Sequence, residues 1–273
     1  MTRIAIFQAR SGIDPAANAA ALVAAIEEAA AGGAAMLFTP EMSGLLDSNR
    51  ERAAGIIGRE ERDTVLKAVR EAADANNIWV QLGSLALAGD RDRFVNRAFV
   101  IDDAGEIRAH YDKIHLFDVD LPTGESWRES AVYEGGKRAV LVRGTPVGAL
   151  GLTICYDVRF PALFERLSEA GAEVIAVPAA FTVPTGKAHW EILLRARAIE
   201  AGLFIVAAAQ GGSHEDGRKT YGHSLVIDPW GEVLLDAGDE GGVHFAEIEL
   251  GRISEVRSRV PALKHRRKVP AID

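Results

Sequence analysis

Short apolar runs alternate with amphipathic stretches along most of the chain. Residues 15–31 place apolar side chains at helical spacing, with Pro15 suited to a first helical turn and Gly32-Gly33 to a stop. The runs 4–7 and 36–38 on either side are short and apolar, which is typical of β-strands. The same rhythm predicts further helices at 61–75, 160–170 and 189–201 and further strands at 78–82, 174–177 and 203–208. Helices therefore cover at least one face of a sheet.

Two other segments predict antiparallel hairpins, because short polar turns join their strands. The first hairpin joins 94–101 to 107–111, and the second joins 224–227 to 233–235. Such hairpins beside parallel strands predict mixed sheets. The sequence contains no low-complexity linker, sustained heptad or fixed-period repeat. We therefore expect one layered α/β domain over residues 1–273.

The composition and net charge of the chain indicate which kinds of ligand it can bind. The chain has 273 residues, 48% of them hydrophobic, with a formal net charge of -8 and a pI near 5.5. This charge does not attract a polyanion, so nucleic acid and anionic membranes are poor partners and a small molecule fits better. We expect neither a signal peptide nor a membrane span, because no apolar run is long enough. A single cysteine permits no internal disulfide, so we expect a reducing compartment, the cytoplasm.

The single cysteine, Cys155, lies where the apolar run 147–154 ends and the helix near Phe160 begins. A strand-to-helix turn exposes side chains, its N–H groups can hold a developing oxyanion, and the helix dipole favours a thiolate. The alternative is a buried cysteine that acts as a small apolar group, as most lone cysteines do. The charged neighbours Asp157 and Arg159 favour the first interpretation, so Cys155 is a candidate nucleophile.

A cysteine nucleophile needs a base, because a thiol with a pKa of about 8.5 is mostly protonated at neutral pH. His189 could pair with Cys155, as in Cys-His proteases, but it opens a predicted helix and could equally bond its neighbours. His115, His214 and His223 lie in loops or at strand edges, where a hydrogen-bonding role is more common. The histidines show no metal-ligand spacing.

Glu41 is the carboxylate alternative for the base. It follows the strand at 36–38 and so lies at the same kind of sheet end as Cys155. Alternatively, Glu41 is a structural carboxylate that accepts hydrogen bonds from backbone N–H groups at the start of a helix. Sequence alone does not choose between these two.

Lys113 follows a third strand, in an aromatic-rich loop. It is either partly desolvated there or a solvated loop charge. Asp118 and Asp120 alternate nearby like a carboxylate pair, but they lack the further ligands that a metal site needs, so we expect no metal.

Three motifs give the chain a resemblance to the nitrilase superfamily of carbon-nitrogen hydrolases. The Glu-Lys-Cys triad of that superfamily is matched, in the same order, by Glu41 in FTPEM, Lys113 in YDKIHLFDV and Cys155 in ICYDVRFP. The resemblance continues over nearly the whole chain through PTGKAHWE, RARAIE, YGHS and DPWG. These blocks are most similar to the Nit branch, which contains ω-amidase and deaminated glutathione amidase, and AAAQGGSH is closer to the latter.

The resemblance implies a four-layer αββα sandwich, an α/β fold of two mixed β-sheets flanked by helices. It also implies pairing into a homodimer and no cofactor. By the same resemblance, Glu41 takes the thiol proton and later activates water, and Cys155 forms a thioester and releases ammonia. Lys113 and the backbone N–H of Tyr156 stabilise the tetrahedral oxyanion. A second glutamate near the substrate is matched by Glu129 in WRES, with a surface charge as its alternative.

Substrates of this branch carry carboxylate and 2-oxo groups beside the amide, so the resemblance implies cations in the pocket. Arg159, just beyond the nucleophile, is the candidate for a bidentate carboxylate contact. Arg195 and Arg197 are expected to bridge helices instead. Phe181 and Thr182 match a substrate-lining loop of the family, and core packing is the alternative for Phe181.

The leading hypothesis is therefore a cysteine-dependent amidase. It would hydrolyse the side-chain amide of a small 2-oxo acid, or of deaminated glutathione, to a carboxylate plus ammonia through a thioester. A nitrilase or an N-carbamoyl amidase would use the same triad on a nitrile carbon or a ureido carbonyl. The residues also allow a non-catalytic, ligand-binding member of the fold, or a Cys-His protease that depends on His189.

Overall fold

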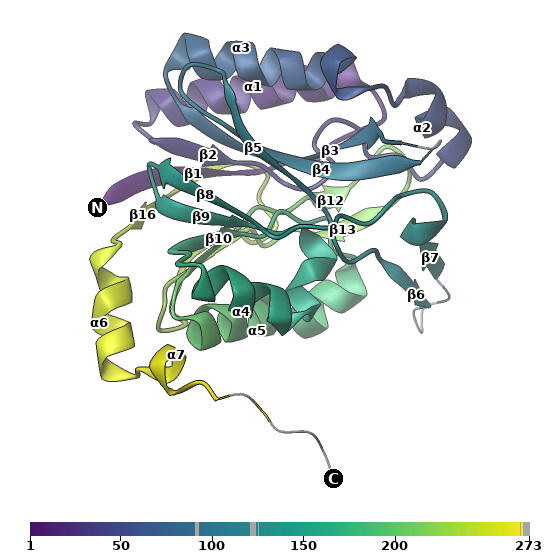
Figure 1. Cartoon of the computed structure of the whole chain (residues 1–273). Coiled ribbons are helices and arrows are strands. Elements are labelled where there is room, and N and C mark those ends of the chain that lie inside the picture. Colours follow the sequence, from purple (N-terminus) through teal and green to yellow (C-terminus); the bar gives the residue numbers. More distant parts are fainter. Residues whose placement is uncertain (91–92, 121–123, 125, 268, 270–273) are drawn as a thin grey trace.

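Two six-stranded mixed β-sheets lie face to face in the computed structural model of the chain, with helices on both outer sides (Figure 1). The structure describes residues 1–90, 93–120, 124, 126–267 and 269. Helices α1 (Pro15–Ala31) and α3 (Thr64–Asn76) cover one sheet, and α4 (Pro161–Glu169) and α5 (Val183–Ala201) cover the other. The layers therefore run α–β–β–α, which confirms the predicted four-layer sandwich.

The first sheet has the strand order β16-β1-β2-β3-β4-β5. Strands β1, β2 and β3 are parallel, whereas β16, β4 and β5 are antiparallel to their neighbours. The six strands are β1 (Thr2–Gln8), β2 (Met36–Phe38), β3 (Trp79–Ala88), β4 (Phe94–Ile101), β5 (Ile107–Asp112) and β16 (Gly242–Ile248). The predicted hairpin of β4 and β5 is confirmed.

The second sheet has the order β15-β14-β11-β10-β9-β8, again with three parallel strands in the middle. Its strands are β8 (Val140–Thr145), β9 (Gly148–Leu152), β10 (Val174–Ala176), β11 (Phe204–Ala207), β14 (Leu225–Ile227) and β15 (Val233–Asp236). The hairpin of β14 and β15 is the second one predicted, and it is confirmed as well.

Smaller elements surround the two sheets. Two short hairpins pair β6 (Asp118–Asp120) with β7 (Ser126–Arg128) and β12 (Gly211–Ser213) with β13 (Lys219–Tyr221). The remaining helices are α2 (Arg50–Ile56), α6 (Gly251–Arg259), α7 (Ala262–His265) and the 3-10 turns η1 (Glu60–Arg62), η2 (Glu129–Ala131) and η3 (Cys155–Arg159). In the described part of the chain, none of the helices is long and apolar enough to cross a membrane.

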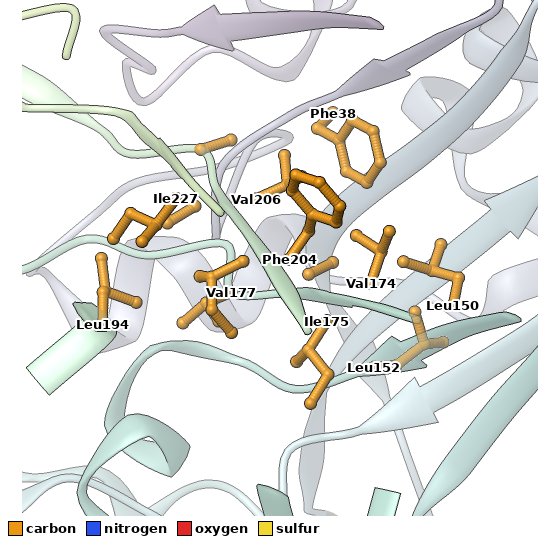
Figure 2. Packing of buried hydrophobic residues seen from close by; sticks show 14 of the residues in the cluster. Phe38, Leu150, Leu152, Val174, Ile175, Val177, Leu194, Phe204, Val206 and Ile227 are labelled. Carbon is orange, nitrogen blue, oxygen red and sulfur yellow. The ribbon is translucent and has the colours of Figure 1, made fainter. Parts of the chain in front are cut away.

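Strand alternation divides the apolar residues of the first sheet between two cores. Successive side chains point to opposite faces of a strand. Ile4, Ile6 and Phe38 therefore pack in the central core between the sheets, while Ala5 and Leu37 pack under α1 and α3. Figure 2 shows part of the buried cluster to which Ile4, Ile6 and Phe38 belong. The cluster also includes residues of the second sheet and Leu194 of α5, which covers the outer side of that sheet. Burial of this apolar surface drives the layering.

The predicted start was correct for α1 and wrong for α3 and α5. Helix α1 has the predicted bounds, and the Asp14 side chain accepts a hydrogen bond from the Ala16 N–H at its start. The helix predicted from 61 starts at Thr64, because the Asp63 side chain caps it. The prediction that His189 opens a helix is wrong. Helix α5 begins at Val183, since a proline in the first turn is compatible with a helix start.

The expectation of one domain over residues 1–273 stays a prediction. Parts of that range, residues 91–92, 121–123, 125, 268 and 270–273, lie outside the described residues. The two central sheets both contribute to one apolar core, which is what a single domain requires.

Candidate active site

Three strand ends bring Glu41, Lys113 and Cys155 to one cavity. Glu41 lies in the turn that follows β2, Lys113 comes directly after β5, and Cys155 opens η3 just beyond β9. All three side chains are buried, and all three residues line the same cavity. The residues are far apart in sequence, and the facing sheets place them together.

Glu41 is held by donors on both of its oxygens. Its Oε1 accepts hydrogen bonds from Lys113 Nζ at 2.8 Å and Asn96 Nδ2 at 2.9 Å, and its Oε2 accepts one from the Ala180 N–H at 3.0 Å. Burial alone would raise the pKa of Glu41, but the charge of Lys113 and the hydrogen bonds from Lys113, Cys155 and Asn96 hold that pKa below its usual value. Glu41 is therefore an ionised carboxylate, the form that can act as a base.

Lys113 lies between two carboxylates. Besides Glu41, its Nζ contacts Glu129 Oε1 at 3.2 Å and Oε2 at 3.0 Å. Burial would lower the pKa of Lys113, but the charges of Glu129 and Glu41 raise it well above the usual value, so the ammonium persists. Glu129 also accepts a hydrogen bond from the Phe117 N–H at 2.6 Å. Glu129 is thus part of the site and not a surface charge.

Cys155 occupies a strained turn. Its φ of 48° is in the left-handed region, and its N–H donates to the Pro178 carbonyl at 2.8 Å. Burial raises the pKa of the Cys155 thiol well above its usual value and the charge of Glu41 raises it further, although Lys113 and the Ala180 N–H lower it. The thiol is therefore protonated beside an ionised Glu41, so the proton can move from sulfur to carboxylate during attack.

Asp157 joins the loop after β5 to the turn that carries Cys155. Its Oδ2 accepts hydrogen bonds from the Tyr111 hydroxyl at 2.7 Å and the Ile154 N–H at 2.9 Å. Its Oδ1 accepts the His115 N–H at 3.1 Å and lies 2.7 Å from His115 Nδ1. Burial and the charge of Asp157 raise the pKa of Tyr111, so its hydroxyl remains a donor. This fully buried carboxylate links the two sheets at the site.

The predicted substrate contacts fall into two groups. Tyr156, Phe181 and Thr182 line the cavity. Arg159 does not belong to the described lining: its guanidinium lies over the rings of Tyr156 and Phe181, at 5.9 and 5.5 Å from their centroids. One of its nitrogens, Nη2, is 3.3 Å from His189 Nδ1. The structure therefore places Arg159 and His189 against each other, outside the described lining of the cavity.

His115, His214 and His223 form structural hydrogen bonds, as expected. His115 bonds Asp157, and His223 Nδ1 lies 3.0 Å from Asp236 Oδ1. His214 is buried, and burial lowers its pKa. No histidine occurs in the cavity lining over the residues that the structure describes. A Cys-His pair therefore has no support in the geometry.

The two arginines and two aspartates that the sequence singled out away from the cavity form hydrogen bonds or ion pairs within the protein. Arg195 Nε donates to the Gly231 carbonyl, and Arg197 Nε donates to the Val158 carbonyl, which connects α5 with η3. Asp118 accepts a hydrogen bond from the Ser130 hydroxyl, and Asp120 forms an ion pair with Arg128. Over the described ranges, no group of three or more His, Cys, Asp or Glu side chains is placed to hold a metal ion.

Sequence reasoning missed several residues of the site. Asn96 bridges Glu41 and Glu129, with Nδ2 at 2.9 and 3.3 Å from their Oε1 atoms. Its signal was a polar residue in the middle of the apolar run 94–101. Arg218 lines the cavity from a hairpin that had not been predicted, and no local pattern identifies it.

The two facing sheets place the chain in a structural class that includes known enzymes. The nitrilase–Fhit fusion protein of Caenorhabditis elegans superposes with a TM-score of 0.90 at 39% identity, over 97% of this chain and 65% of that chain. A mutant of the amidase from Nesterenkonia sp. AN1, with acrylamide added to its active-site cysteine, superposes with a TM-score of 0.80 at 26% identity, over 96% and 98% of the two chains.

Residues 3–258 match the family model for carbon-nitrogen hydrolases, and the chain belongs to that family. The deaminated glutathione amidase of Yersinia enterocolitica is 39% identical over 272 residues, which are 98% of this chain and 94% of the relative. The predicted resemblance to the nitrilase superfamily is confirmed. The protein is a hydrolase, an amidase that acts on carbon–nitrogen bonds other than peptide bonds.

Proposed function

We propose that Cys155 attacks the amide of a small 2-oxo acid, or of deaminated glutathione, with Glu41 as the base and Lys113 as the oxyanion donor. One observation carries this proposal: the Lys113 ammonium is 2.8 Å from Glu41 Oε1 in the cavity that Cys155 also lines. The Yersinia relative, which is named for deaminated glutathione, supports this substrate class. The active-site cysteine of the Nesterenkonia amidase supports the nucleophile.

The first half-reaction forms a thioester. Glu41 takes the thiol proton as the Cys155 sulfur bonds to the amide carbon, and the carbonyl electron pair moves onto oxygen. The Lys113 ammonium and the Tyr156 N–H hold this oxyanion. When the carbonyl re-forms, the carbon–nitrogen bond breaks and Glu41 returns the proton to the leaving nitrogen. A primary amide releases ammonia, and a substituted amide releases an amine.

The second half-reaction regenerates the enzyme. Glu41, ionised again, takes a proton from water, whose oxygen attacks the thioester carbon. The carbon–sulfur bond breaks, sulfur regains the proton, and the acid leaves. Glu129 positions Lys113 throughout, because its two oxygens contact Nζ at 3.2 and 3.0 Å. Charge developing on oxygen thereby meets a fixed ammonium that is buried.

Amide hydrolysis by cysteine variants tests this function. Wild type should release ammonia from ω-amides of short acids, and Cys155→Ala and Cys155→Ser should lose that activity while they remain folded. Nitriles and N-carbamoyl compounds are assayed in parallel, because the same residues could attack them. Equal rates for wild type and Cys155→Ala would refute the proposal.

We also propose that the protein is a homodimer in the cytoplasm. Ile192, Ile199 and Trp230 are 69%, 54% and 52% exposed, and the two isoleucines are seven residues apart on one face of α5. An exposed apolar face of this kind is typical of an interface between subunits. A chain with a single, unpaired cysteine suits a reducing compartment.

A further inference from the structure

The cavity has more positive charge than the chain as a whole would suggest. The formal net charge of the chain is -8. Apart from Glu41, Lys113 and Glu129, the charged residues of the described lining are four cations and one carboxylate, namely Arg50, Arg128, Arg218, Lys219 and Asp47. Asp47 is already engaged, with Arg52 Nε at 2.6 Å from its Oδ2. Arg128 and Arg218 are paired as well, with Asp120 and Asp216, so the walls can hold an anionic ligand only through donors that these pairs leave open.

Arg218 is the cation whose position is best defined. Its Nε and Nη2 lie 3.1 and 3.0 Å from Asp216 Oδ2, and its guanidinium lies over the Trp127 ring at 4.9 Å from the centroid. The Asp216 side chain is fully buried, whereas the Arg218 side chain keeps 18% exposure. A guanidinium has five N–H donors, and the contacts described for Arg218 use only the edge that faces Asp216. The donors on its opposite edge remain for a ligand in the cavity that Arg218 lines.

The hairpin that carries Arg218 is fixed by buried hydrogen bonds. The Arg218 N–H donates to Asp216 Oδ1 at 3.0 Å, and its carbonyl accepts the His214 N–H at 2.9 Å. The buried His214 ring lies 2.9 Å from the Ser11 carbonyl and 2.6 Å from Thr220 Oγ1. Little ordering is left to occur when a ligand binds, and such preorganisation favours affinity.

Three further cations of the lining are less suited to hold a ligand. Arg128 Nη2 donates to the Asp120 carboxylate, and Arg128 Nη1 donates to two backbone carbonyls. The side chain of Arg50 is exposed and donates to the Arg128 carbonyl, and Lys219 is exposed as well. Exposed side chains lose more conformational entropy on binding than one already held in place.

We propose that Arg218 binds a carboxylate of the substrate, so that the enzyme prefers amides of acids over neutral amides. The inference deepens the proposed function and rests on it. A planar guanidinium matches a carboxylate through two parallel hydrogen bonds, and its stacking on Trp127 fixes the plane of the pair. This contact replaces the one that sequence had suggested for Arg159, which faces His189.

Binding to a chain that cannot turn over tests the inference. In the Cys155→Ala background, calorimetry compares glutaramate, the monoamide of a five-carbon diacid, with its uncharged methyl ester. Arg218→Met should weaken glutaramate binding about tenfold or more, as the loss of a charge-assisted hydrogen bond predicts, and ester binding less than about threefold. Arg252→Met is the matched control, because Arg252 is also partly exposed and bonded to a buried aspartate, Asp228, away from the cavity.

The possible outcomes separate the two proposals. Equal weakening of both ligands by Arg218→Met, no weakening of either, or the same loss from Arg252→Met would overturn the carboxylate subsite. Failure of the Cys155→Ala protein to bind glutaramate would overturn it as well. Selective glutaramate binding through Arg218, without hydrolysis by wild type of any ω-amide of a short acid or 2-oxo acid, would support the subsite and contradict the proposed function.

Discussion

Glu41 and Cys155 differ in protonation because they face different charges. Glu41 receives hydrogen bonds from the Lys113 ammonium, which lowers its pKa despite burial. Cys155 faces the ionised Glu41, which adds to the effect of burial and raises the thiol pKa. The resting site thus holds an ionised carboxylate beside a neutral thiol. A Cys-His pair would instead hold a thiolate beside an imidazolium.

The pH dependence of kcat/KM distinguishes these two resting states. A base with a lowered pKa stays ionised until the pH falls through that pKa, so the acidic loss of activity should lie below 4.5, the usual value for Glu41. A thiol with a raised pKa stays protonated above 9.0, its usual value. We therefore expect kcat/KM for an ω-amide to be constant between these two pH values. A loss of activity centred near pH 6.5 would indicate a histidine base and contradict the assignment.

Replacement of Lys113 tests the oxyanion donor. Lys113→Met should lower kcat about 10²- to 10³-fold, with a smaller effect on KM, because the ammonium contributes most when charge develops on oxygen. It should also lower the melting temperature, since Glu41 and Glu129 would lose the cation between them. Lys67→Met, at an exposed site on α3, is the control. Retention of kcat within about threefold of wild type, in a folded Lys113→Met protein, would count against this role.

At the scale of elements, a glycine lets the turn that carries Glu41 lie against β3. A Cβ at Gly83 would be 2.1 Å from the Thr39 carbonyl oxygen and 2.4 Å from the Pro40 carbonyl oxygen. The Gly83 N–H also donates to Thr39 Oγ1 at 3.0 Å. Since the contacting atoms belong to the backbone, a side chain at this position must displace the turn, and Glu41 moves with it.

Gly83→Ala should therefore reduce activity without removing any reactive group. A shift of about 1 Å in a catalytic side chain costs on the order of 10²-fold in rate, so we expect a loss of at least tenfold in kcat. Steady-state assays and thermal unfolding measure the effect on activity and on stability. Gly251→Ala is the control, because a Cβ at that exposed glycine meets no atom within 4 Å. Wild-type kcat in Gly83→Ala would show that the close approach does not position Glu41.

Elements with strong local signals could be predicted from sequence, and elements set by distant contacts could not. Helix α1 has an aspartate cap, a proline in its first turn and a glycine at its end, and its bounds were correct. Strand β16 pairs with β1 from the far end of the chain and was missed, because long-range pairing leaves only a weak local pattern.

The same distinction holds for the candidate site. Glu41, Lys113 and Cys155 were found because each lies in a motif at a strand end. Arg218 reaches the cavity only through the folding of a hairpin, and Arg159 is not in the described lining although it is close to Cys155 in sequence. Which cation lines a pocket depends on tertiary structure, so spacing in sequence does not determine it.

At the scale of the whole molecule, the exposed face of α5 predicts self-association. A charge placed in an apolar interface must be desolvated, so Ile192→Glu should shift the proposed dimer toward monomer. Sedimentation velocity at several protein concentrations measures the change. Lys67→Glu, on α3 of the opposite helical layer, adds negative charge away from this face and serves as the control. A dimer that Ile192→Glu leaves intact would show that another surface is used.

The proposed mechanism requires a covalent bond between Cys155 and the acyl group of an amide. Rapid quenching in acid, followed by mass spectrometry of the intact protein and its peptides, tests this bond directly. We predict that wild type mixed with an ω-amide gains the mass of the acyl group on the peptide that contains Cys155, at a rate no slower than turnover, and that Cys155→Ser gains no thioester. Turnover of the amide with no acyl adduct on that peptide would contradict the mechanism.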